Sequence, residues 1–123
     1  SFSSVSLEPR LVLWSIRREA SSHAAFTRSG GFTVSVLAQP QQALARQFAT
    51  GSMTQRLAGV PVQRLASERL RLEGVSAWFD CELHQLVEAG DHHIVIGAVR
   101  DFGWSEQPAL GYCRSRFGGF VAD

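Results

Sequence analysis

The alternation of apolar and polar positions predicts a mainly β protein with five strands. Runs rich in β-branched, aromatic and other apolar residues fall at residues 11–16, 32–38, 75–87, 92–102 and 110–120. The first run is apolar on both faces apart from Ser15, which predicts a strand buried on both sides or in the wall of a barrel. A Gly-Asp pair at residues 90 and 91 predicts a tight hairpin between the third and fourth strands.

Two short helices are expected between these strands. Ser21 or Ser22 is a suitable N-cap for a helix that ends at Ser29, before a Gly-Gly pair. The second helix is predicted from Pro40 to about Phe48, because proline is favoured in a first helical turn. Residues 51–68 show no clean period and are expected to form a loop. The order of elements fits a small, mostly antiparallel barrel with helices at its ends.

The length and net charge of the chain restrict the kinds of protein that it can be. A chain of 123 residues is predicted to be one domain. A formal net charge of +1 argues against a nucleic-acid-binding protein that works through bulk electrostatics. No apolar run approaches the length of a membrane span, and two cysteines do not indicate a secreted disulfide scaffold. We therefore expect a cytoplasmic protein that acts on neither nucleic acid nor membranes.

Possible metal ligands are present, but their spacing is unfavourable. The candidates are Cys81, His84, His92, His93 and Cys113. They include no close C-x-x-C pair and no H-x-x-x-H pair on a helix. Cys81 and His84 are three residues apart in a predicted strand, so their side chains should point to opposite faces. No metal site is predicted.

Two sequence segments carry a family resemblance. Residues 1–9 read SFSSVSLEP and residues 90–99 read GDHHIVIGAV. These segments resemble the short-chain flavin reductase family, the small partners of two-component flavin monooxygenases. The family pattern is S-F-x-S-V-S-L-D-P-P, and later G-D-H followed by a strand with a glycine. Four further segments resemble the family in order along the chain: residues 32–37, 41–49, 81–83 and 108–117.

The chain departs from the family pattern at several positions. Glu8-Pro9-Arg10 replaces D-P-P, Ser35 replaces a usual asparagine, and His93 stands where threonine is frequent. Family members usually carry one or two more strands before the serine-rich motif, and these hold part of the flavin site. The resemblance therefore leads us to expect that the N-terminal part of the domain is missing from residues 1–123.

The resemblance implies a fold, a reaction and partners. The implied fold is an FMN-binding split β-barrel that forms a homodimer. The implied reaction is the reduction of FMN or FAD by NADH or NADPH. Reduced flavin would then pass to a separate monooxygenase component. No G-x-G-x-x-G motif follows a predicted strand, so a nicotinamide nucleotide would not be held by a Rossmann domain.

The resemblance also assigns roles to four groups of residues. The serine-rich segment would position the flavin, and an arginine-serine cluster would hold its phosphate. His92 would contact the nicotinamide, Asp91 would fix the histidine tautomer, and two aromatic residues would wall the pocket. The flavin and wall residues are Ser1, Phe2, Ser3, Ser4, Ser6, Tyr112 and Phe117; the phosphate residues are Arg17, Arg18, Ser21 and Ser22.

Each group also has a purely structural interpretation. A serine-rich segment can be a polar edge strand, and arginines beside a capped helix are routine surface features. An Asp-His-His tip can be an ordinary polar hairpin. At the level of function, three alternatives remain: a pyridoxamine-phosphate-oxidase-like FMN enzyme, a flavin-binding or electron-carrying module, and an interaction domain without a cofactor.

Overall fold

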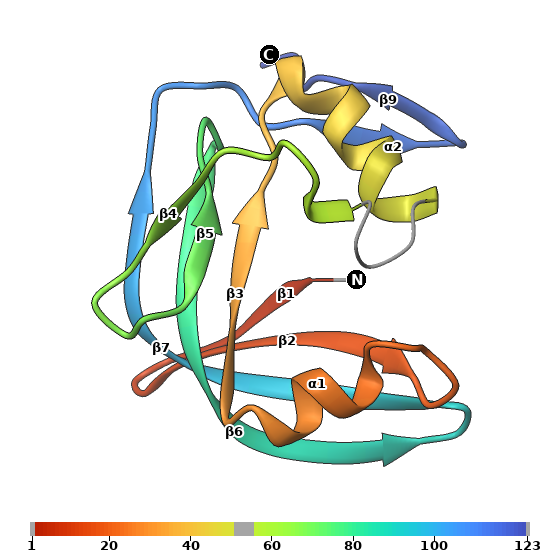
Figure 1. Cartoon of the computed structure of the whole chain (residues 1–123), viewed down its shortest axis with the longest axis vertical. Coiled ribbons are helices and arrows are strands. Elements are labelled where there is room, and N and C mark those ends of the chain that lie inside the picture. Colours follow the sequence, from red (N-terminus) through yellow and green to blue (C-terminus); the bar gives the residue numbers. More distant parts are fainter. Residues whose placement is uncertain (1, 51–55, 123) are drawn as a thin grey trace. The chain divides into compact units, whose positions relative to one another are not determined.

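The computed structural model describes residues 2–50 and 56–122, and it is mainly β, as predicted. The largest sheet has five strands (Figure 1). In the order of the sheet they are β1 (Ser3–Leu7), β2 (Arg10–Arg17), β7 (His92–Trp104), β6 (Ala77–Ala89) and β3 (Gly31–Val36). The pairings of β1 with β2 and of β2 with β7 are antiparallel. The sheet order ends at β1 and β3, so the described residues do not close it into a barrel.

Two hairpins and short helices complete the described chain. The hairpins are β4 (Val62–Arg64) with β5 (Leu70–Leu72), and β8 (Gly111–Cys113) with β9 (Arg116–Gly118). The helices are α1 (His23–Arg28), the 3₁₀ turn η1 (Gln39–Gln41) and α2 (Gln42–Thr50). The residues divide into two compact units. Unit 1 comprises Ser1–Val34 and Phe79–Phe102, and unit 2 comprises Ser35–Trp78 and Gly103–Asp123.

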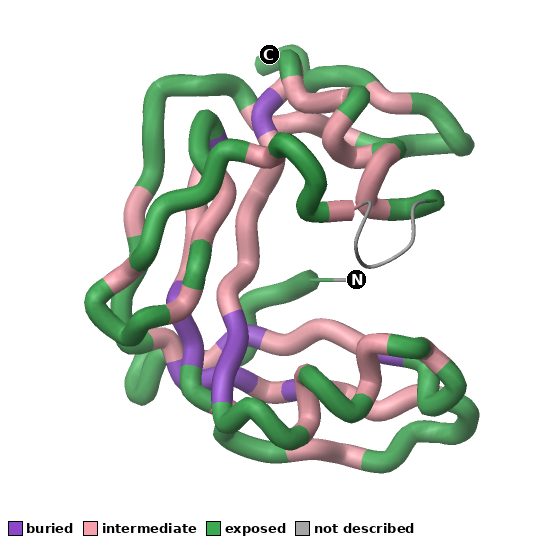
Figure 2. Tube along the Cα trace, in the orientation of Figure 1, coloured by how far each residue is buried: buried purple, intermediate pink, exposed green. Residues whose placement is uncertain are grey.

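The core of unit 1 lies on one face of the large sheet. Its buried members come from four strands: Val12, Ile16, Phe32, Cys81 and Val95. Trp14 adds edge-on ring contacts to Phe26 of α1, at 4.9 Å between centroids, and to Phe32, at 5.7 Å. Helix α1 therefore packs on this face, and Figure 2 shows buried stretches of the trace on the strands of the sheet. Residues 11–16 of β2 are all buried or half-buried, with full burial at Val12 and Ile16, so side chains on both faces of this strand are at least partly covered.

Three local predictions need correction. The predicted strand 110–120 is the β8–β9 hairpin, because Arg114 and Ser115 turn the chain with φ of 52° and 62°. The predicted loop 51–68 contains β4, which pairs with β5. Ser22 is the N-cap residue of α1, but its hydroxyl makes no capping hydrogen bond. Neither an Arg-Ser turn nor an isolated three-residue strand has a strong sequence signal.

Candidate functional site

The end of β2 meets the beginning of β7 in unit 1 and brings several predicted site residues together. Arg17 pairs with His92, and Ile16 pairs with His93. Directly opposed residues of an antiparallel pair share a face, and successive residues alternate. Arg17 and His92 therefore lie on one face, while His93 lies on the opposite face with the core. The backbone N–H of Arg18 donates to the carbonyl of Asp91 at 3.0 Å, which ties the two strand ends together.

Asp91 holds one nitrogen of the His92 ring. The distance from His92 Nδ1 to Asp91 Oδ1 is 2.7 Å. This hydrogen bond to His92, together with the attraction of the imidazole, lowers the pKa of Asp91 below its ordinary value of 3.8. An ionised carboxylate only accepts hydrogen bonds, so Nδ1 carries the proton. Nε2 of His92 is then the ring nitrogen without a proton, which can accept a hydrogen bond, and the side chain is 39% exposed.

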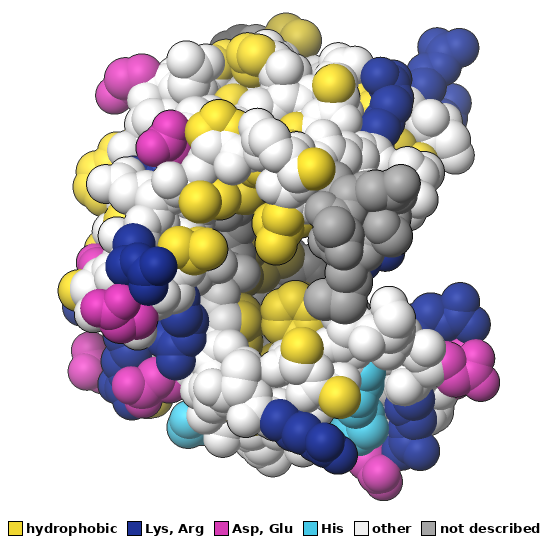
Figure 3. Space-filling view, in the orientation of Figure 1, with side chains coloured by type: hydrophobic (Ala, Val, Ile, Leu, Met, Phe, Trp, Pro, Cys, Tyr) yellow, Lys and Arg dark blue, Asp and Glu magenta, His cyan; other side chains and the backbone are white. Residues whose placement is uncertain are grey.

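His93 is engaged on the other side of the sheet. Its Nδ1 lies 2.9 Å from Nε2 of His23, at the start of α1. Its side chain is only 17% exposed, and Nε2 lies 4.0 Å from Glu88. Figure 3 shows histidine side chains beside arginine and acidic side chains at this end of unit 1. The sequence analysis missed His23, because 70 residues separate it from His93 and no motif joins them.

The four residues predicted to bind the flavin phosphate differ in how far other residues already engage them. Arg18 forms an ion pair with Glu88 at 2.7 Å. Arg17 is exposed and forms no ion pair with a residue that the structure describes. Ser21 and Ser22 precede α1, which has six residues, and the Ser22 hydroxyl is not used as a cap. The convergence of a capping hydroxyl with a guanidinium is therefore not seen. Arg17, whose charge also helps to lower the pKa of Asp91, is the guanidinium here that forms no ion pair with a described residue.

The serine-rich segment forms an edge strand of the large sheet. Ser3, Ser4 and Ser6 pair with β2, and the register shifts between Ser4 and Ser6. The outer edge of β1 carries no strand in the described sheet, so backbone groups there are open to a ligand. The Phe2 ring lies 5.5 Å from that of Phe79. Ser1 lies outside the described residues.

The serine strand, β1, and the histidine corner, which is the meeting point of Arg17, Asp91 and His92, lie at different points along β2. Ser3 pairs with Leu13, and Arg17 pairs with His92. Leu13 and Arg17 are four positions apart in β2, which corresponds to about 13 Å at the usual rise of a strand. Leu13 and Arg17 lie on the same face of β2, so Ser3 and His92 share a face of the sheet but stand at different points along it.

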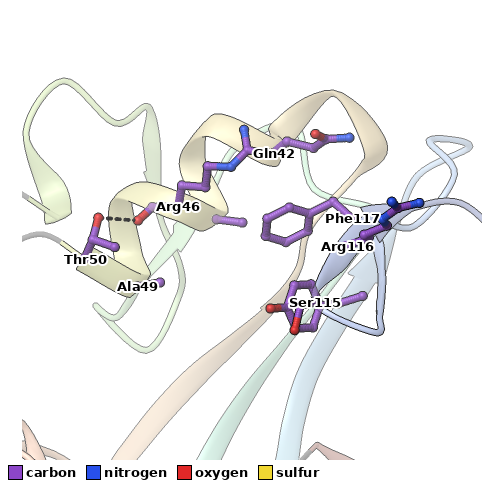
Figure 4. A pocket seen from close by; sticks show the side chains of 9 residues that line it. Gln42, Arg46, Ala49, Thr50, Ser115, Arg116 and Phe117 are labelled. Atoms are coloured by element: carbon purple, nitrogen blue, oxygen red, sulfur yellow. Dashed lines mark hydrogen bonds between the residues drawn. The ribbon is translucent and has the colours of Figure 1, made fainter.

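Tyr112 and Phe117 belong to unit 2, where they do line a pocket. A groove of about 820 Å³ separates α2 from the β8–β9 hairpin (Figure 4). The rings of Tyr112 and Phe117 pack with their centroids 5.0 Å apart. Arg46 lies with its guanidinium carbon 5.3 Å from the centre of the Phe117 ring. Sequence reasoning missed Arg46, although its spacing from Gln42 and Ala49 places all three on one helix face.

The described part of the chain holds neither a metal-binding cluster nor a membrane-spanning helix. Across residues 2–50 and 56–122, no three His, Cys, Asp or Glu side chains are grouped so that they could hold a metal ion. The helices of the same residues include none that is long and apolar enough to cross a membrane.

Comparison with known proteins identifies a family. The family model described as "Flavin reductase like domain" matches residues 1–120. A flavin reductase of Pseudomonas putida is 41% identical over 123 residues, which cover 99% of this chain and 72% of that protein. The reductase component of the trigonelline monooxygenase of Acinetobacter baylyi is 38% identical, and its match covers 95% of this chain but 37% of that protein. The chain thus spans between a third and three quarters of these relatives.

A solved structure is similar over the whole chain. The NADH:FAD oxidoreductase of Streptomyces globisporus, in complex with NAD and FAD fragments, superposes with a TM-score of 0.92 at 34% identity. The match covers 100% of this chain and 75% of that one. The reductase component of 4-hydroxyphenylacetate 3-monooxygenase from Thermus thermophilus is 36% identical across 91% of this chain and 70% of that protein.

Proposed function

Because the chain belongs to the flavin reductase-like domain family, we propose that it reduces FMN or FAD at the expense of NADH or NADPH. The observation that carries this proposal is the family match across residues 1–120. The nicotinamide supplies a hydride and the flavin accepts it, so the two cofactors carry the chemistry themselves. The protein has to bind both, align them and exclude other encounters. The same observation favours a reductase over the alternative flavin-binding functions.

The serine strand fits a flavin ring in its chemistry. The edge of such a ring needs hydrogen-bond donors at its carbonyl oxygens and ring nitrogens, but little charge. Ser3, Ser4 and Ser6 supply hydroxyls, and the open edge of β1 supplies backbone N–H groups. Ser4 and Ser6 also border a small, mainly apolar depression beside Phe79. We assign flavin positioning to this strand, with Phe2 beside it.

The corner of unit 1 fits an anionic group and a neutral polar one. Arg17 offers a guanidinium without an ion pair to any described residue, and Ser21 and Ser22 offer hydroxyls. We therefore assign phosphate binding to Arg17, with Arg18 held back by Glu88. His92 presents Nε2 on the same face as Arg17, which suits a hydrogen bond to the nicotinamide carboxamide.

A homodimer accounts for the separation of the serine strand from His92. In a twofold dimer, His92 of one copy can face the serine strand of the second copy, which gives two equivalent shared sites. We expect light scattering to give a mass near twice 13.5 kDa. A clean monomer that binds flavin and reduces it would show that the site is not shared.

Reduced flavin, the product of the proposed reaction, would be used by another protein. Relatives such as the Acinetobacter baylyi and Thermus thermophilus proteins are reductase components of monooxygenases. We propose that reduced flavin from this protein leaves for a separate monooxygenase component. A cytoplasmic location stays a prediction.

Flavin binding is the direct test of the proposed site. Titration of the protein into oxidised FMN, and separately into FAD, should quench the flavin fluorescence. The Arg17→Ala variant should bind the phosphate-bearing flavin several-fold more weakly, because a charge-assisted hydrogen bond is lost. The Arg64→Ala variant is the matched control, since Arg64 lies in unit 2 and pairs with Glu68. No binding of either flavin at high micromolar protein would contradict the proposal.

His92→Ala should lower the catalytic efficiency with NADH or NADPH about threefold to tenfold, which is the effect of one neutral hydrogen bond. The affinity for flavin should stay almost unchanged. Steady-state rates at varied nicotinamide concentration measure the first quantity, and fluorescence titration measures the second.

His93→Ala is the control for this prediction. It removes the contact with His23 on the opposite face, so it should lower stability and leave catalytic efficiency near that of the unaltered protein. Equal effects of the two substitutions on efficiency would mean that the hairpin acts only structurally. A large effect at His93 alone would reverse the assignment of the two faces.

A further inference from the structure

The groove of unit 2 is built from two elements that leave room between them. From α2 it is lined by Gln42, Ala45, Arg46, Ala49 and Thr50, and two of these five are alanines. Small side chains on the helix leave space beside the larger side chains of the hairpin, and the resulting volume is about 820 Å³. Cofactor and substrate sites commonly have volumes of about 300–1,000 Å³. The groove is therefore large enough for half of a dinucleotide.

The described charged side chains that line the groove are all positive. Arg46 and Arg116 are among its lining residues, and none of the described lining residues is acidic. Arg46 makes no ion pair with a residue that the structure describes; it lies over the Phe117 ring. A guanidinium stacked on a ring keeps its edge N–H groups free for an anion. The groove therefore favours a negatively charged ligand.

An aromatic surface lies beside this charge. Tyr112 is 66% exposed, although its ring packs against Phe117. Exposed aromatic rings next to an arginine offer a stacking surface for a planar group. Figure 4 shows the Phe117 ring directed toward α2, whereas Arg116 points away from the helix. Arg46 thus contacts the aromatic pair directly, over the Phe117 ring.

The turn of the hairpin is strained where it borders the groove. Arg114 and Ser115 have φ of 52° and 62°, a region that glycine or asparagine normally occupies. Non-glycine residues held in this region concentrate at ligand sites and switch regions. The strained turn places Ser115 on the lining of the groove, where its hydroxyl adds to those of Thr50 and Tyr112.

We infer that this groove binds the adenosine diphosphate half of a dinucleotide substrate. Arg46 holds a phosphate, Tyr112 stacks on the adenine, and the Ser115 hydroxyl faces the ribose. The Thr50 hydroxyl already donates to the carbonyl of Arg46 at 2.8 Å, so it can accept a hydrogen bond from the ribose. The inference rests on the proposed function, because NADH, NADPH and FAD all carry this half and FMN does not. A simple aromatic acid would leave much of the 820 Å³ volume and most of the hydroxyls unused.

The test uses ADP alone, followed by isothermal titration calorimetry. ADP should bind the unaltered protein. Arg46→Ala should weaken binding about tenfold or more, through the loss of a charge-assisted hydrogen bond. Tyr112→Ala should also weaken it, through the loss of the stacking surface. Arg64→Ala should leave ADP affinity unchanged, because Arg64 is exposed, lies outside the groove and pairs with Glu68.

Two further titrations identify the class of ligand. Benzoate tests for a site that takes any aromatic acid, and pyrophosphate tests for a site that takes any polyanion. Either one binding as tightly as ADP would overturn the inference, as would equal ADP affinity of the Arg46→Ala variant and the unaltered protein.

Steady-state kinetics separate this inference from the proposed function. With FMN as acceptor, Arg46→Ala should raise the KM for NADH and leave the KM for FMN unchanged. A protein that reduces FMN but does not bind ADP would overturn the groove assignment and keep the proposed function. A protein that binds ADP but reduces neither flavin would keep the nucleotide groove and overturn the proposed function.

Discussion

Phe32→Ala should lower the free energy of unfolding by about 3–5 kcal/mol, the range observed when a buried aromatic side chain is truncated. Phe32 is 4% exposed and packs against Trp14 and the middle of β7. Its removal leaves a cavity in the core on one face of the sheet, which the rigid strands cannot close. Urea unfolding followed by tryptophan fluorescence measures the change.

Phe120→Ala is the control for this substitution. Phe120 is the same residue type but is 79% exposed, so its truncation should change stability by about 0.5 kcal/mol or less. A loss at Phe32 no larger than that at Phe120 would show that Phe32 does not fill the core of unit 1 as described.

Gly97→Ala should also destabilise the protein, by about 1–3 kcal/mol, through overpacking. A Cβ at Gly97 would lie 2.5 Å from Phe32 Cζ and 2.9 Å from Cys81 Cβ. The phenyl ring can tilt, but the Cβ of Cys81 is fixed to its strand. The matched control is Gly118→Ala, because a Cβ there meets nothing within 4 Å. Equal unfolding midpoints for the two variants would contradict this packing.

The effects of substitutions at Phe32 and Gly97 on stability should be coupled, because these two residues are in direct contact. In a Phe32→Leu background the shorter side chain leaves space at the position that a Cβ of residue 97 would take. The cost of Gly97→Ala should therefore be smaller there than in the unaltered protein. Additive losses would mean that contact with Cys81 alone limits residue 97.

Gly97 also explains part of the family pattern in physical terms. The resemblance includes a glycine in the strand after G-D-H, and in this chain that residue is Gly97. The glycine lets the Phe32 ring and Cys81 approach β7 closely. Because β7 begins at His92, close packing at its centre also fixes the strand that carries the histidine.

The sequence predicted the long elements because their signals are local. Strands β2, β3, β6 and β7 follow apolar runs, and Gly90 has the positive φ of 63° that the hairpin requires. The β8–β9 hairpin was missed because Arg114 and Ser115 are not residues that favour its turn.

The candidate site shows the same division between contacts that are local in the sequence and contacts that join distant residues. The bond between Asp91 and His92 joins neighbours in the chain, so the motif pointed to it. The contacts of His23 with His93 and of Arg46 with Phe117 each join residues about 70 positions apart. Both depend on which strand or hairpin lies next to a helix. Periodicity gives the face of an element but does not give its neighbour.

The most direct test of the central claim is the oxidation of NADH and NADPH, followed by absorbance, with and without added FMN or FAD. The proposed function predicts that oxidation depends on added flavin, saturates with flavin concentration and yields reduced flavin under anaerobic conditions. A folded protein that oxidises neither nucleotide with either flavin would contradict it.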